Sequence, residues 1–239
     1  SSSMWLTWSG GCTKSLPCYR KMADELKDLS YQGTVMLAGY GEPLLSKNAV
    51  DMVRALSPVA NTEVTTNGDP LTPGLIGDLI EAGIGKIILS LYDGPHQIDE
   101  FTSLFNEAGA PEDVFILRDR WYSVDDEFGV KLTNRAGTVS VGHQPEVQTD
   151  KPCYYPHYMM MIDWNGDAFL CTQDWNRRVK SGNVFLTSLL DVWTSRNLRK
   201  YRKMLGNGKR GLWPCQGCNA VGTIHGEVHK DAWNEFYGK

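Results

Sequence analysis

The chain has 239 residues, of which 41% are hydrophobic and 22% are charged, so it can bury a sizeable core and is not a disordered chain. A formal net charge of -4 gives no basic footprint, and we expect no nucleic-acid partner. No run approaches the length of a membrane span and no signal segment stands at the N-terminus, so we expect a cytoplasmic protein without membrane contact.

The first part of the chain alternates between apolar, strand-like runs and segments with helical apolar spacing. Strands that alternate with helices imply a parallel sheet with right-handed crossovers. Six such units are too few for a closed, eight-stranded TIM barrel, so the predicted fold class is α/β with an open, partial (β/α)6 barrel. We predict strands at 5–8, 34–38, 62–66, 86–91, 113–117 and 130–133, and helices at 21–29, 46–56, 72–82 and 97–107.

A smaller second module is expected after a polar, glycine-containing linker at 137–150. Apolar runs at 158–163 and 168–171 flank Asn165-Gly166, a strong signal for a hairpin turn. A helical segment at 188–205 and a short final helix from Gly226 complete the module. We therefore divide the chain into a barrel domain, 1–140, and a small domain of a β-hairpin and helices, 141–239.

The first cysteine pair, Cys12 and Cys18, is incomplete as a cluster site. Three thiolates spaced Cys-x3-Cys-x2-Cys would hold an iron–sulfur cluster with one iron open, and this pair stands one position too close for that spacing. One cysteine inserted between Ser15 and Leu16 restores it. We interpret the absence as a modified cysteine omitted from the written sequence, and a true deletion is the alternative.

The second cysteine set consists of Cys153, Cys171, Cys215 and Cys218. A hairpin could bring its two halves together, and four thiolates close a site. Structural zinc and an iron–sulfur cluster both use such ligation, so the spacing alone does not decide between them. Disulfides are a weaker alternative in a chain without a secretion signal.

Polar loops follow several predicted strands, at the carboxyl ends where parallel α/β folds bind ligands. Glycines there let the backbone approach a ligand, and Glu42 or nearby carbonyls could accept from an ammonium group, although a tight turn is the plain alternative. Arg135 suits a carboxylate or a substrate hydroxyl, or equally a surface salt bridge. The loops contain Gly39, Tyr40, Gly41 and Glu42, then Thr66 and Asn67, then Ser90, and finally Asn134 and Arg135.

Taken together, the cysteines, the 39–43 and 66–68 loops, the 134–137 segment and the Cys-x12-Gly-x4-Cys element resemble radical SAM enzymes with a C-terminal twitch domain, the shortened relative of the SPASM domain. The resemblance implies two [4Fe-4S] clusters. Cys12, Cys18 and the unwritten cysteine would hold one, with S-adenosyl-L-methionine (SAM) on its open iron, and Cys153, Cys171, Cys215 and Cys218 an auxiliary one. It further implies a SAM site lined by Tyr19, Gly39, Tyr40, Gly41, Glu42, Thr66, Asn67, Ser90 and Asn134.

The same resemblance implies an oxidoreductase that cleaves SAM to a 5'-deoxyadenosyl radical and removes hydrogen from a small substrate. We expect it to oxidise a carbohydrate or cyclitol alcohol to a ketone, with Arg135 holding or deprotonating the hydroxyl and a flavodoxin or ferredoxin donating electrons. Peptide maturation and sugar epimerisation are alternative reactions, and a true deletion would favour a non-enzymatic, cluster-bearing protein. Epimerisation ranks below oxidation because it often needs a spare thiol, and every cysteine is already assigned.

Overall fold

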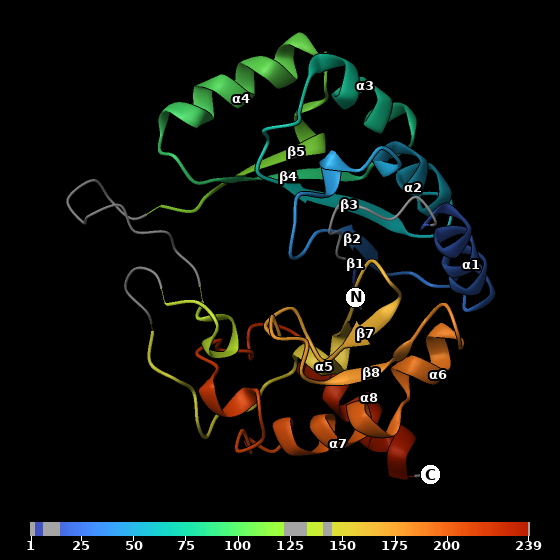
Figure 1. Cartoon of the computed structure of the whole chain (residues 1–239), viewed down its shortest axis with the longest axis vertical. Helices are drawn as coiled ribbons and strands as arrows, with labels where there is room; N and C mark the ends of the chain where they lie inside the picture. Colours follow the sequence, from blue (N-terminus) through green and yellow to red (C-terminus); the bar gives the residue numbers. More distant parts are fainter. Residues whose placement is uncertain (1–2, 7–14, 122–132, 141–144, 239) are drawn as a thin grey trace. The chain divides into compact units, whose positions relative to one another are not determined.

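The computed structural model describes residues 3–6, 15–121, 133–140 and 145–238 (Figure 1). The described residues fall into two compact units, 3–121 with 163–165, and 133–162 with 166–238. The predicted division at 140 differs from this grouping, since Asn134 hydrogen bonds to Gly217 and Asn219 within the second unit.

The first unit is an α/β unit whose strands pair in parallel, in the order β5-β4-β3-β2-β1. Sequential strands are neighbours, so right-handed crossovers place helices α1 to α4 on one face of the sheet (Figure 1). The strands are β1 Ser3–Leu6, β2 Thr34–Leu37, β3 Asn61–Thr66, β4 Lys86–Leu91 and β5 Phe115–Asp119, and the helices are α1 Ser15–Asp28, α2 Ala49–Leu56, α3 Pro73–Glu81 and α4 His96–Glu107.

These elements confirm the parallel α/β fold, and the five observed strands overlap the first five predicted strands. Most of the predicted sixth strand, 130–133, falls outside the described residues, and Thr133 itself is in no strand. Local signals fix the helix ends: the hydroxyl of Thr72 caps α3 by accepting from the Leu75 amide at 3.1 Å, and Pro73 occupies its first turn.

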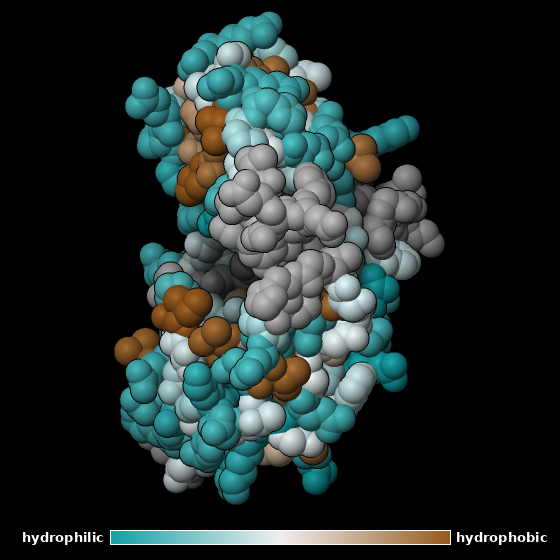
Figure 2. Space-filling view, turned by 90° about the vertical axis from the view of Figure 1, so that its left-hand side faces the viewer, coloured by the Kyte–Doolittle hydropathy of each residue, from teal (hydrophilic) through white to brown (hydrophobic). Residues whose placement is uncertain are grey.

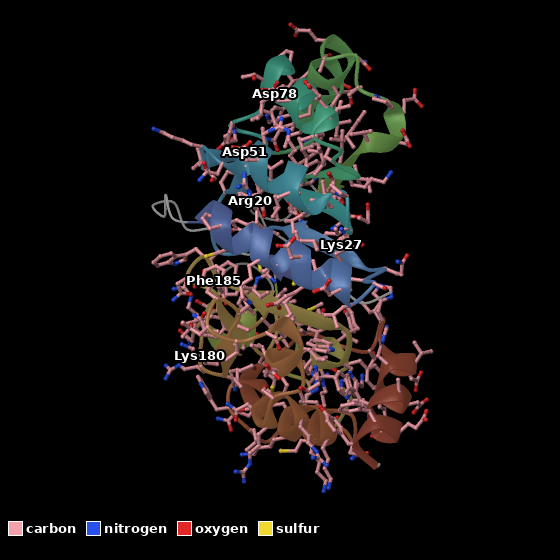
Figure 3. All side chains as sticks on the ribbon, turned by 90° about the vertical axis from the view of Figure 1, so that its right-hand side faces the viewer. Arg20, Lys27, Asp51, Asp78, Lys180 and Phe185 are labelled. Carbon is pink, nitrogen blue, oxygen red and sulfur yellow. The ribbon has the colours of Figure 1, made fainter. Side chains whose placement is uncertain are left out.

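The second unit contains an antiparallel sheet of β6 (Met159–Ile162), β7 (Asp167–Phe169) and β8 (Lys180–Asn183). The predicted hairpin is confirmed. Its turn needs Gly166, because φ is +83° there and an added β-carbon would lie 2.5 Å from the Phe185 ring. The Lys180 ammonium at the start of β8 pairs with the Asp167 carboxylate on β7 at 2.6 Å. Lys180 and Phe185 are labelled in Figure 3. Strand β8 was not predicted, because Lys-Ser-Gly-Asn lacks an apolar pattern.

Helices α5 (Tyr155–Tyr158), α6 (Leu189–Trp193), α7 (Arg196–Leu205) and α8 (Glu227–Gly238) complete the second unit. The helical segment expected at 188–205 consists of two helices, α6 and α7. Thr194 ends α6, and the Ser195 hydroxyl caps α7 by accepting from the Leu198 amide. The buried Arg202 on α7 donates to the carbonyls of Pro156 and Trp193, both at 2.7 Å.

The molecular face in Figure 2 is mainly hydrophilic, with small separate groups of apolar residues. Scattered exposed apolar side chains are ordinary on a folded surface. Within the described part of the chain, no helix is both long enough and apolar enough to cross a bilayer.

Candidate metal centre and cofactor loops

In the first unit, Glu42 joins the loops that follow β2 and β3. One carboxylate oxygen accepts from the Leu44 amide and the other from the Asn67 amide, both at 2.9 Å. The structure thus brings these two predicted site loops together. Because both oxygens of Glu42 already serve the backbone, its first role is to position the loops, and each oxygen keeps a second lone pair for a ligand donor.

The Thr66 hydroxyl continues this arrangement by accepting from the Gly68 amide at 3.0 Å. Gly68 has φ +92° and an added β-carbon would lie 2.3 Å from the Phe101 ring, so only glycine fits there. The side chains of Tyr19 on α1 and Ser90 on β4 are both buried. The contacts with SAM predicted for these residues, and for Gly39, Tyr40 and Gly41, stay predictions.

The first cysteine pair is described only at Cys18, which lies half-buried on α1; Cys12 is outside the described residues. Helix α1 begins at Ser15, six residues before the predicted start at Lys21, so the expected insertion point between Ser15 and Leu16 falls in its first turn.

We predict that the polypeptide carries one more cysteine than its written sequence, between Ser15 and Leu16, since this insertion restores all three ligand spacings. Intact-mass measurement on the denatured chain checks this, with peptide mapping of the segment from Cys12 to Cys18 to place the addition. A mass equal to that of the written sequence would contradict the prediction and leave a true deletion.

The four cysteines of the second set come together in the second unit. Cys153, Cys171, Cys215 and Cys218 line one cavity, with Tyr155 and Arg210 among their neighbours. A set of four thiolates suits an iron–sulfur cluster, in which each thiolate binds its own iron, and it equally suits a structural zinc ion. The donor set alone does not decide between these two groups.

Electrostatics around these thiols favour their neutral form as long as no metal is bound. Burial raises the pKa of all four thiols, that of Cys215 to about 12, and nearby cysteines raise the pKa further at Cys153, Cys171 and Cys215. Burial and the charges of Cys153, Cys171 and Cys218 raise the pKa of Tyr155 to about 12. Bound metal would offset the cost of ionising the thiols, because thiolates are the ligating form.

Sequence analysis missed Arg210, which clamps the two ends of this site. Its guanidinium is buried and donates to four backbone carbonyls at 2.6–2.8 Å, those of Lys151, Pro152, Ala220 and Val221. These carbonyls flank Cys153 on one side and follow Cys218 on the other. The arginine stands in a glycine-rich loop with no periodic pattern, so no local signal marked it.

Asn134 and Arg135 lie beside Cys218 in the second unit. The Asn134 side chain donates to the Gly217 carbonyl at 2.7 Å and accepts from the Asn219 amide at 3.2 Å. The Arg135 guanidinium carbon lies 5.1 Å from the centroid of the Trp175 ring. The predicted SAM contact of Asn134 and substrate contact of Arg135 stay predictions, whereas their place at the four-cysteine site is observed.

Comparison with known proteins favours the iron–sulfur cluster over zinc at the four-cysteine site. Residues 153–219 match the SPASM family, an iron–sulfur cluster-binding domain. A SAM-dependent 2-deoxy-scyllo-inosamine dehydrogenase of Niallia circulans is 29% identical over 208 residues, which are 85% of this chain and 79% of that protein.

Two solved structures report on the fold. BtrN in complex with AdoMet and 2-DOIA superposes with a TM-score of 0.76 at 24% identity, covering 95% of each chain. SuiB of Streptococcus suis, bound to S-adenosylmethionine, gives a TM-score of 0.53 at 14% identity, over 93% of this chain and 77% of that one. The chain therefore resembles radical SAM enzymes that carry a SPASM-type iron–sulfur domain, and Cys153, Cys171, Cys215 and Cys218 all lie within the matched residues.

Proposed function

We propose that this protein is a radical SAM dehydrogenase that oxidises an alcohol of a small cyclitol or carbohydrate to a ketone. The observation that carries the proposal is the convergence of Cys153, Cys171, Cys215 and Cys218 on one cavity with Arg135 beside them. An electron acceptor and a group that binds hydroxyls would then stand in one unit. Similarity to a dehydrogenase over most of the chain supports the same reaction.

In this proposal the first unit is a partial barrel that binds SAM. The loops fixed by Glu42 present backbone carbonyls of 39–41 to the methionyl ammonium group, and the 66–67 loop and Ser90 line the rest of the site. Cys12, Cys18 and the additional cysteine hold the first [4Fe-4S] cluster. When bound, this cluster and SAM supply a carbon-centred radical that removes one hydrogen atom from the substrate.

The remaining steps concern the substrate hydroxyl. Arg135 donates hydrogen bonds to it and orients it; an arginine of ordinary pKa is a poor base, so water or a neighbouring group takes the proton. Loss of that proton and of one electron turns the radical carbon into a ketone. An iron–sulfur cluster held by Cys153, Cys171, Cys215 and Cys218 would be the acceptor of that electron. Overall, the substrate loses two electrons and two protons.

We expect about eight irons per chain after anaerobic reconstitution, because each of two [4Fe-4S] clusters contributes four. A variant lacking Cys12 and Cys18 is expected to retain about half of them, since Cys153, Cys171, Cys215 and Cys218 close their own site. Iron and zinc analysis with electron paramagnetic resonance checks this. Stoichiometric zinc in that variant would contradict the auxiliary assignment.

The reaction type is tested in deuterium oxide with enzyme, reductant, SAM and candidate cyclitols. We expect a product two mass units lighter than the substrate, formed with 5'-deoxyadenosine, because dehydrogenation removes two hydrogens. An isomer carrying one solvent deuterium would instead establish epimerisation. A flavodoxin or ferredoxin is the proposed electron donor, and each is compared with dithionite in the same assay.

A further inference from the structure

The short segment Asn134–Gly137, here called the 134–137 turn, is strained. Arg135, Ala136 and Gly137 have φ of +46°, +54° and +87°, so three consecutive residues lie in the left-handed region and only the last is glycine. For each non-glycine residue this conformation is sterically unfavourable. Such strain persists only where surrounding contacts hold it in place.

Those contacts come from the Cys215–Cys218 loop. Asn134 and Asn219 bond reciprocally: the Asn134 amide donates to the Asn219 side chain at 2.8 Å, and the Asn219 amide donates to the Asn134 side chain at 3.2 Å. A third bond runs from the Asn134 side chain to the Gly217 carbonyl at 2.7 Å. Asn219 is itself buried and also donates to the Pro145 carbonyl.

The hydrogen bonds between Asn134, Gly217 and Asn219 hold the 134–137 turn close to the Cys218 sulfur. Ala136 packs against Cys218 in one cluster with Ala220, the amide of Ala136 lowers the pKa of this thiol, and the Ala220 amide donates to the sulfur at 3.4 Å. At Cys153 and Cys171 the amides that lower the pKa are those two positions onward, of Tyr155 and Gln173. At Cys218 the turn therefore adds a donor from a distant part of the chain. The positive charge of Arg135 also acts on this thiol, lowering its pKa against the larger effect of burial.

Successive amides around a left-handed residue form a concavity that favours anions, and such concavities occur at iron–sulfur sites. Reduction adds negative charge to a cluster, so donors and cations near its sulfurs raise its reduction potential. We propose that the 134–137 turn sets the reduction potential of the auxiliary cluster, through the Ala136 amide and the Arg135 guanidinium at Cys218. This inference rests on the proposed auxiliary cluster and is independent of the substrate and of dehydrogenation.

The experiment uses the full chain with Cys12→Ala and Cys18→Ala, so that only the auxiliary cluster is reconstituted, and omits SAM and substrate. Redox titration followed by absorbance and electron paramagnetic resonance gives the potential. We expect Arg135→Gln and Asn134→Ala each to lower the reduction equilibrium constant at least tenfold, which is about 59 mV for one electron. Arg135→Lys is expected to restore most of the loss caused by Arg135→Gln, because it keeps the charge.

Arg199→Gln is the matched control, since Arg199 also stacks on an aromatic ring of the second unit, with its guanidinium carbon 4.7 Å from the centroid of Tyr237. This variant is expected to keep the reduction equilibrium constant within twofold of that of the parent chain. Unchanged potentials in Arg135→Gln and Asn134→Ala at full iron content would overturn the inference. Loss of the cluster from Arg135→Gln would overturn it too, by assigning that side chain to assembly. Failure to oxidise any substrate leaves these readings unaffected.

Discussion

Replacing Arg210 with Met is expected to destabilise the second unit by about 3 kcal/mol or more, because four carbonyls lose their charged donor at once, one of them in a buried and three in part-buried hydrogen bonds. The segments on either side of the cysteine site are then no longer held together. We therefore expect the auxiliary cluster to be lost together with stability. Denaturant unfolding of the apo chain and iron content of the reconstituted chain measure the two effects separately.

Lys209→Met is the matched control, since Lys209 is the exposed cationic neighbour of Arg210. It removes the same charge from the same loop but leaves the four hydrogen bonds of Arg210 in place. We expect the free energy of unfolding to change by no more than about 0.5 kcal/mol. Equal stability and iron content in Arg210→Met and Lys209→Met would show that the four hydrogen bonds contribute little.

Acidification is expected to destabilise the protein through His157. Burial, together with the positive charges of Arg202 and Lys230, lowers the pKa of this imidazole to about 4. In the unfolded chain its pKa is about 6.5, so the unfolded state binds a proton first as the pH falls. The contribution of neutral His157 to the free energy of unfolding is complete above pH 6.5 and is lost as the pH falls toward 4. About 2 kcal/mol of it is lost between pH 7 and pH 5.

His157→Gln removes this titration, and His225→Gln, at an exposed position, serves as control. Denaturant unfolding of the apo forms at pH 7, 6 and 5 gives the comparison. We expect the stability difference between the parent chain and His157→Gln to shrink by about 2 kcal/mol over this range. A difference that stays constant with pH would mean that His157 is accessible to protons in the folded state.

The strands and helices of the first unit were predictable because each carries a local signal. Thr72 and Pro73 mark the start of α3, and buried runs such as Lys86–Leu91 fill a parallel strand that is covered on its apolar faces. The hairpin at Asn165-Gly166 was predictable for the same reason. The interruption between α6 and α7 at Ser195 was not predictable, because apolar residues recur at helical spacing on both sides of it.

The candidate site divides in the same way. Cysteine spacing predicted that Cys153, Cys171, Cys215 and Cys218 come together, and they line one cavity. That they bind a cluster stays a prediction. The spacing did not predict Arg210 or Asn219, whose partners are backbone carbonyls and amides distant in sequence. Nor did it predict the left-handed backbone at Arg135 and Ala136, because neither residue type favours that conformation. Contacts that depend on tertiary placement leave no periodic trace in the sequence.

The order of the cysteines along the chain has a topological consequence. Cys171 and Cys215 bracket β8, α6 and α7, so a cluster bound to both closes that whole stretch into a covalent ring. By analogy with a disulfide, closing a loop of this length removes about 4 kcal/mol of chain entropy from the unfolded ensemble. Losing the cluster would therefore weaken the folded state of this stretch, with its two helices, by about 4 kcal/mol relative to its unfolded ensemble.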